Sequence, residues 1–202
     1  MNKDCYSIVL MFLKYDELLN VATVNKMFLE LSQNDDLWKR LCENDDFIYP
    51  VIKTTKFYHF DTYKTYFILE KFLNKYKMNL KNTFYSKTLN LSHNKLSVIP
   101  TEIGALTNLQ RLWLNNNNLS VLPTEIGALT NLRNLRMNNN KLSVLPAEIG
   151  SLTNLQYLSL NNNKLSVLPA EIGALTNLQT LWLHSNKLSV LPAEIGALTN
   201  LH

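Results

Sequence analysis

The chain has 202 residues, of which 46% are hydrophobic, and its formal net charge of +4 is spread thinly without a basic block, so we expect no nucleic-acid partner. No stretch approaches the roughly 18 consecutive apolar residues of a membrane-spanning helix, and the apolar run Ile8–Leu13 is too short for a secretion signal, so we expect no membrane contact. The missing signal and the presence of only two cysteines indicate a reducing compartment: the cytoplasm, the nucleus or, for a viral protein, the host cytoplasm.

Helical periodicity runs through the first 46 residues. An apolar cluster around Leu10 is followed by apolar residues at three- and four-residue steps from Val21 to Leu31, which is typical of an amphipathic helix. Asn34 and the two aspartates after it provide caps for a last short helix that begins at Leu37. We predict a three-helix domain over residues 1–46, of a size that often needs a neighbour or partner for stability.

The run from Val9 to Leu41 resembles the F-box, whose central Val-Cys-Lys pattern it carries as Val24-Asn25-Lys26. It departs from the family in lacking the opening Leu-Pro pair, which would fall on Met1-Asn2, and in having Asn25 where a small residue is usual. The resemblance implies docking onto the Skp-family adaptor of a cullin ubiquitin ligase; the alternative is a helical cap that only shields the first repeat. The adaptor contacts that it implies are Cys5, Val9, Leu10, Leu13, Leu18 and Val24.

Residues 47–83 are rich in Lys, Tyr and Phe. Asp61 or Thr62 is placed to cap a helix in this segment, and we predict a helical spacer that covers the open amino end of the repeats. The interleaved basic and aromatic residues would also suit RNA contact, but an amphipathic helix is favoured. The predicted apolar face of the helix comprises Tyr66, Leu69, Phe72, Leu73 and Tyr76.

Residues 84–202 consist of one unit repeated with a period of 23, and the segment Leu165–Leu178 recurs unchanged at Leu188–Leu201. Aligned units give the pattern Leu-x-x-Leu-x-Leu-x-x-Asn-x-Leu about five times. From Ser86 onward the chain resembles the leucine-rich repeat family in its 23-residue intracellular form. The resemblance implies an α/β fold in which a short solenoid of about five repeats carries a parallel β-sheet on its concave face.

Each column of the repeat has a structural interpretation. The alternating leucines face the core, and the Asn column from Asn94 to Asn186 lies where the chain turns and can bind its backbone groups. The Pro column from Pro100 to Pro192 suits the first position of a short helix. The Gly column from Gly104 to Gly196 suits a left-handed residue that closes it.

The outward positions of the predicted strands are where the units differ most. They include Trp, Tyr and Arg, the residue types that most often carry interface energy, although a purely protective role over the sheet is the alternative. Five strands span only roughly 20–25 Å, which suits a loop or short peptide of a partner. The predicted target-binding residues are Arg111, Trp113, Asn134, Arg136, Tyr157, Ser159, Thr180, Trp182 and His184.

Enzyme signatures are missing from the sequence, so we expect no catalytic residues, no cofactor and no metal. The five glycines fall one per repeat and not in a phosphate-binding loop. His93 and His184 are four repeats apart and cannot share a metal. Cys42 follows Trp38 in a predicted helix without a nearby His, which favours a buried thiol over a nucleophile.

Two functions remain open from the sequence. The first is the substrate receptor of a Skp–cullin–F-box ubiquitin ligase, which binds a protein target on the concave face and the adaptor through the F-box. The second is a non-catalytic repeat scaffold for a signalling protein. At the carboxy end, Leu191, Ile195, Leu198 and Leu201 are expected to be partly bare, which predicts either a shortened repeat array or self-association through that end.

Overall fold

The computed structural model describes residues 59–202. The predicted domain over residues 1–46, including Cys42, lies outside this range. The chain divides into two units, Met1–Lys71 and Phe72–His202, and the five strands found among the described residues lie in the second unit.

Helix α6 (His59–Asn74) is followed by the short helix α7 (Leu80–Tyr85). The expected cap of α6 is wrong, because Asp61 and Thr62 lie inside the helix, and Tyr76 lies beyond its end. Leu69 and Leu73 are fully buried, as their place on the predicted apolar face requires. The side chain of Asn79 caps α7 by accepting a hydrogen bond from the backbone N–H of Asn82 at 3.1 Å.

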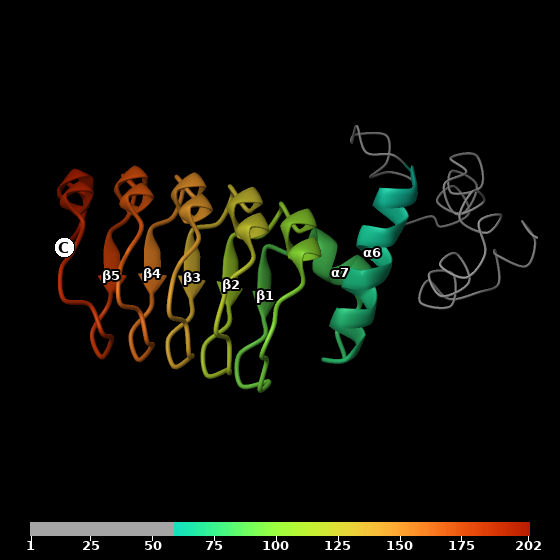
Figure 1. Cartoon of the computed structure of the whole chain (residues 1–202). Helices are drawn as coiled ribbons and strands as arrows, with labels where there is room; N and C mark the ends of the chain where they lie inside the picture. The colour runs from blue at the N-terminus through green and yellow to red at the C-terminus, as the bar shows by residue number, and fades with distance from the viewer. Residues whose placement is uncertain (1–58) are drawn as a thin grey trace, which may run out of the picture. The chain divides into compact units, whose positions relative to one another are not determined.

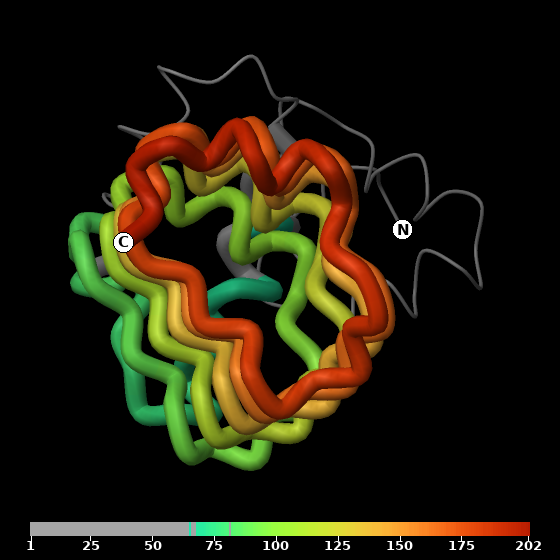
Figure 2. Tube along the Cα trace, turned by 90° about the vertical axis from the view of Figure 1, so that its left-hand side faces the viewer, coloured from blue at the N-terminus to red at the C-terminus, as the bar shows by residue number. Residues whose placement is uncertain are grey.

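The repeats form a solenoid in which each coil contributes one three-residue strand and one 3₁₀ helix (Figure 1). The strands pair in parallel in chain order, and successive coils superpose when seen along the stack (Figure 2). The predicted parallel sheet is thereby confirmed. The strands are β1 (Thr88–Asn90), β2 (Arg111–Trp113), β3 (Asn134–Arg136), β4 (Tyr157–Ser159) and β5 (Thr180–Trp182). The 3₁₀ helices are η1 (Thr101–Ala105), η2 (Thr124–Ala128), η3 (Ala147–Ser151), η4 (Ala170–Ala174) and η5 (Ala193–Ala197).

Leucine columns fill the interior of the stack, as the alternation predicts. The central residue of each of the first four strands is buried, and the isoleucine of each of the first four 3₁₀ helices is buried from the other side. A single coil could not enclose these side chains, so the coils depend on one another for a dry core. The strand residues concerned are Leu89, Leu112, Leu135 and Leu158.

The predicted Asn column joins adjacent coils through buried hydrogen bonds. The Oδ1 of Asn140 accepts from the backbone N–H of Leu119 at 3.0 Å, and its Nδ2 donates to the carbonyls of Leu114 and Met137 at 2.9 and 3.0 Å. Asn117, Asn163 and Asn186 repeat this arrangement. The prediction that these amides bind the backbone of the turn is confirmed.

A second Asn column was not predicted. In each Thr-Asn-Leu segment the side-chain Nδ2 donates to a backbone carbonyl 24 residues earlier, as Asn131 does to Thr107 at 2.9 Å. The first member, Asn108, donates to the carbonyl of Phe84 in α7 at 3.2 Å. Helix α7 therefore takes the place of a preceding coil at this bond. The later members are Asn154, Asn177 and Asn200.

The glycine column has a different cause from the one predicted. No glycine among the described residues has a positive φ, so none serves as a left-handed helix end. Instead, a Cβ on Gly150 would lie 2.6 Å from the carbonyl oxygen of Glu171 in the next coil. Glycine is needed because neighbouring 3₁₀ helices approach too closely for a side chain. The prolines lie just before each 3₁₀ helix, as Pro146 does with φ −67 and ψ 149, and not at its first position.

The last coil is less covered than the others. Leu191 is 47% exposed, and Ile195 and Leu201 are half-buried, as expected. Leu198, however, is 4% exposed, so the expectation of a bare side chain is wrong there. The preceding coil covers Leu198, whereas it leaves Leu191, Ile195 and Leu201 at least partly exposed to solvent.

Two glycines that both follow the sequence Leu-Pro-Ala-Glu-Ile separate the two explanations of the column. We expect Gly150→Ala to lower the free energy of unfolding by about 1–3 kcal/mol, because the new methyl group meets a rigid backbone. In this 202-residue chain nothing lies within 4 Å of the Cβ position of Gly196, so Gly196→Ala should be neutral or stabilising by up to about 1 kcal/mol. Urea denaturation measures both; equal effects would contradict the close-approach explanation.

Candidate functional site

The outward side chains of the five strands form two rows that run across the sheet. Strand register aligns Thr88, Arg111, Asn134, Tyr157 and Thr180 in the first row. It aligns Asn90, Trp113, Arg136, Ser159 and Trp182 in the second. Together with the residues that flank the strands, they make up what we call the outer sheet face. The predicted rows are therefore the observed ones.

An arginine lies between two aromatic rings in the middle of this face. The Cζ of Arg136 is 5.2 Å from the ring centroid of Trp113 and 5.4 Å from that of Tyr157. The Tyr157 and Trp182 rings meet in a T-shaped contact at a centroid distance of 5.5 Å, and the ring centroids of Trp182 and His184 are 6.5 Å apart. Residues from β2 to β5 thus form one continuous aromatic cluster, which is held by ring contacts and not by the core.

The cluster differs from the core in its exposure. Trp182 is 48% exposed, Arg111, Arg136 and His184 are exposed, and Trp113 is half-buried. The prediction is wrong for Ser159, which was expected on the surface but is only 2% exposed. Its short side chain lies below its larger neighbours, and its hydroxyl donates to the Oδ1 of Asn161 at 2.8 Å. It therefore supports the surface without reaching a partner.

The outer sheet face also carries unsatisfied polar atoms. Among the described residues, the two buried side-chain polar atoms without a hydrogen-bond partner are the Nε1 of Trp113 and the Oδ1 of Asn134. Buried polar groups elsewhere in the repeats are paired through the Asn columns, and leaving one unpaired costs about 1–3 kcal/mol. A donor and an acceptor are thus left over on adjacent strands of the same face.

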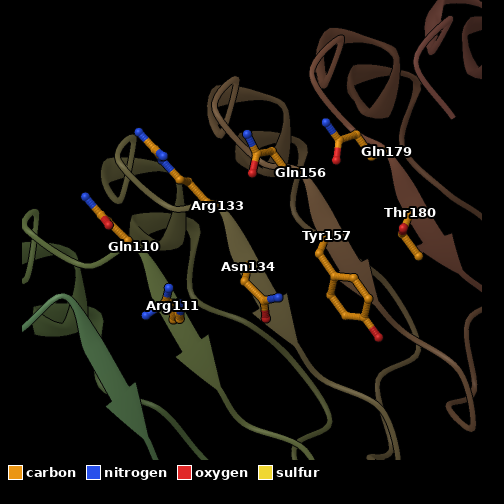
Figure 3. Close-up of a pocket in the computed structure, with 8 residues that line it drawn as sticks. All are labelled: Gln110, Arg111, Arg133, Asn134, Gln156, Tyr157, Gln179 and Thr180. Carbon is orange, nitrogen blue, oxygen red and sulfur yellow. The ribbon is translucent and has the colours of Figure 1, made fainter.

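A groove of about 300 Å³ runs along the amino-terminal ends of β2 to β5. Gln110, Arg133, Gln156 and Gln179 form its upper edge, and Arg111, Asn134, Tyr157 and Thr180 lie along the strands below them (Figure 3). The upper edge was missed from the sequence because only the positions within the strands were considered. A signal was present, since the residue before each strand also varies among the units: it is Lys87, Gln110, Arg133, Gln156 and Gln179.

The charges of the repeats are segregated. Residues 86–202 contain five acidic residues, which are the glutamates of the five 3₁₀ helices. The strands and the positions just before them carry only cationic charge, in Lys87, Arg111, Arg133 and Arg136. Neither Arg111 nor Arg133 has an acidic partner within the part of the chain that the structure describes. The groove therefore presents two guanidinium groups and no carboxylate.

Other kinds of site find no support in residues 59–202. No group of three or more His, Cys, Asp or Glu side chains is placed to hold a metal ion there. His93, expected to be plain surface, is exposed, with its Nε2 3.0 Å from the Nδ2 of Asn116. Within the same range, no helix has the length and apolar character needed to cross a membrane.

Comparison with known proteins agrees with the geometry. The model of the Leucine-rich repeat region matches residues 68–160 and 146–202, which together exceed half of the chain. The chain belongs to the leucine-rich repeat family. The coarse fold prediction is thereby confirmed. No curated protein matches the chain.

Two solved structures show what this leucine-rich repeat chain is similar to. A leucine-rich repeat protein of Leptospira interrogans is 52% identical, with a TM-score of 0.56 over 56% of this chain and 29% of its own. Internalin C2 of Listeria monocytogenes is 30% identical, with a TM-score of 0.52 over 57% of this chain and 49% of its own. The match spans less than half of either protein's length, so it concerns the repeats alone.

The predicted adaptor contacts lie outside the described residues. Cys5, Val9, Leu10, Leu13, Leu18 and Val24 all precede residue 59, where the structure begins. The family match also begins after them, at residue 68. The F-box resemblance therefore stays a prediction from the sequence.

The outer sheet face should contribute little to stability compared with the Asn column. We expect Arg136→Ala to lower the free energy of unfolding by about 1 kcal/mol or less, since it removes exposed cation–π contacts. Asn140→Ala should cost about 2–3 kcal/mol, because it leaves buried backbone groups without partners. Chemical denaturation monitored by circular dichroism compares the two variants. An Arg136→Ala effect as large as that of Asn140→Ala would assign the cluster to the fold.

Proposed function

We propose that this protein is a non-catalytic binding scaffold that holds a protein partner on the outer sheet face of its repeats. The observation that carries the proposal is the cluster of Trp113, Arg136, Tyr157 and Trp182. Large aromatic and Arg side chains lie together at positions that the fold leaves free to vary. These residue types dominate the binding energy of protein interfaces.

The rest of the chain's chemistry favours binding over catalysis. Proteins of this repeat family are typically non-enzymatic scaffolds. The exposed polar side chains in the repeats are mainly amides and hydroxyls, and the carboxylates lie apart from the cluster on the 3₁₀ helices. Binding is also the function that a small, rigid array of parallel strands serves directly, because its side chains are already ordered before the partner arrives.

A paired substitution tests this proposal. Proteins retained from a cell lysate by the wild-type chain should be lost on Arg136→Ala combined with Trp182→Ala, because both side chains reach solvent. The control combines Lys141→Ala with Val167→Ala, whose side chains are also exposed but lie outside the outer sheet face. Quantitative mass spectrometry of the retained proteins provides the measurement. Retention that is unchanged by the first variant, or lost equally on the control, would contradict the proposal.

A more specific version makes the chain the substrate receptor of a Skp–cullin–F-box ubiquitin ligase. Its support is the F-box resemblance over Val9–Leu41. In this version the outer sheet face holds the target, and the ligase supplies the chemistry by proximity. The alternative is a scaffold for a signalling protein, in which the helical front is only a cap.

The adaptor separates these two versions. If the F-box version holds, the chain should retain a Skp-family adaptor from a eukaryotic lysate, and Leu10→Asp with Leu13→Asp should abolish retention. Immunoblotting for the adaptor is the readout, and the Arg136→Ala, Trp182→Ala variant is the control that should still retain it. Absence of the adaptor from the wild-type sample, or undiminished recovery on the aspartate variant, leaves the scaffold version.

A further inference from the structure

We propose that the partner segment held on the outer sheet face is an extended acidic peptide that also carries an aromatic or large apolar residue. The inference rests on the proposed function and specifies the chemistry of the partner. Its acidic side chain would bind Arg111 and Arg133 in the groove, and its apolar side chain would contact Trp182.

The groove selects for negative charge. Arg111 and Arg133 both line it and are exposed, and neither has a carboxylate partner among the described residues. The third arginine of the face is different, because Arg136 is already placed over the rings of Trp113 and Tyr157. A guanidinium pair with free donors is matched by a carboxylate, which accepts two parallel hydrogen bonds from one arginine. No glutamate of the repeats competes, since all five lie in the 3₁₀ helices.

The polar lining of the groove suits a peptide main chain. Gln110, Gln156 and Gln179 place side-chain amides along its upper edge (Figure 3). Asn134 adds another side-chain amide among the residues that line the groove. Amides both donate and accept, as does each residue of an extended peptide. Pockets for small apolar ligands are instead lined mainly by apolar side chains.

The aromatic half of the face lies farther along the strands and toward β5. Trp182 is more exposed than Trp113 or Tyr157, at 48%, and its ring makes a T-shaped contact with that of Tyr157. Strands lie about 4.8 Å apart and successive residues in a strand about 3.3 Å apart. Trp182 lies two positions beyond the register of Arg111 and three beyond that of Arg133, so its backbone is about 14–16 Å from theirs. About four or five extended residues span that distance. The expected motif is therefore an Asp or Glu separated by three or four residues from a Phe, Trp, Tyr or Leu.

A nucleic acid would fit this face less well. Proteins that bind a nucleic-acid backbone neutralise many phosphates, on the order of 6–10. The outer sheet face offers three arginines and Lys87, and Arg136 is engaged with its neighbouring rings. Its exposed charge matches one or two carboxylates.

Selection from a library of random linear peptides on the full chain tests the inference. The selected peptides should be enriched in Asp and Glu and carry the spaced apolar residue. For peptides then synthesised, fluorescence anisotropy should give a Kd about tenfold higher on Arg111→Gln combined with Arg133→Gln. The matched control is Lys141→Gln with Lys164→Gln, which removes the same charge from exposed positions outside the face, and its Kd should stay within about twofold of wild type.

The other outcomes would contradict the acidic-peptide inference alone or together with the proposed function. Peptides that lose binding on Trp182→Ala but show no acidic enrichment and no response to the arginine variant would overturn the acidic partner and leave the proposed function standing. No selected peptide, or peptides indifferent to both variants, would overturn both. An equal loss on the lysine control, or tighter binding of a mixed-sequence single-stranded RNA than of the peptides, would also overturn the acidic-peptide inference.

Discussion

The whole fold depends on the requirement that every coil match the next. A strand of three residues and a 3₁₀ helix of five are too short to be stable alone. They persist because the leucine interior, the Asn columns and the close contacts at glycine bind each coil to its neighbour. Each of these interactions joins residues about one period apart, so a change in one coil affects two.

This matching divides the residues into two groups with different constraints. Asn140 and Gly150 each contact the backbone of a neighbouring coil at fixed positions, so any replacement disturbs the stack. Arg111 and Trp182 contact no neighbouring backbone by a side-chain hydrogen bond among the described residues. Their identity is therefore free to serve recognition, and the binding surface requires no departure from the fold.

The repeat fold could be predicted from the sequence because its signal is local and recurs about five times. Strand register, leucine burial and the first Asn column all follow from one 23-residue pattern. The glycine column was misinterpreted because the approach of Gly150 to Glu171 involves two coils, and a distance between coils is not visible in either coil's sequence. The second Asn column was missed for the same reason, since Asn131 binds Thr107 in the preceding coil.

The candidate site was predicted in part. The strand positions were correct as rows, but Ser159 is buried by its neighbours, and the upper edge of the groove, with Arg133, lies one residue before the strands. Ser159 is buried because its side chain is smaller than those around it. Arg133 reaches the groove because of the path that the chain takes into β3. Neither follows from the alternation of the repeat, which states only the side of the sheet that a residue faces.

Site-specific photo-crosslinking tests most directly whether partners contact the outer sheet face. A photoreactive amino acid is placed at Gln156, an exposed residue of the groove, or at Glu148, an exposed residue of η3. The account predicts that a partner protein is crosslinked from position 156 and not from position 148. Crosslinking from position 148 alone, or equally from both, would contradict it.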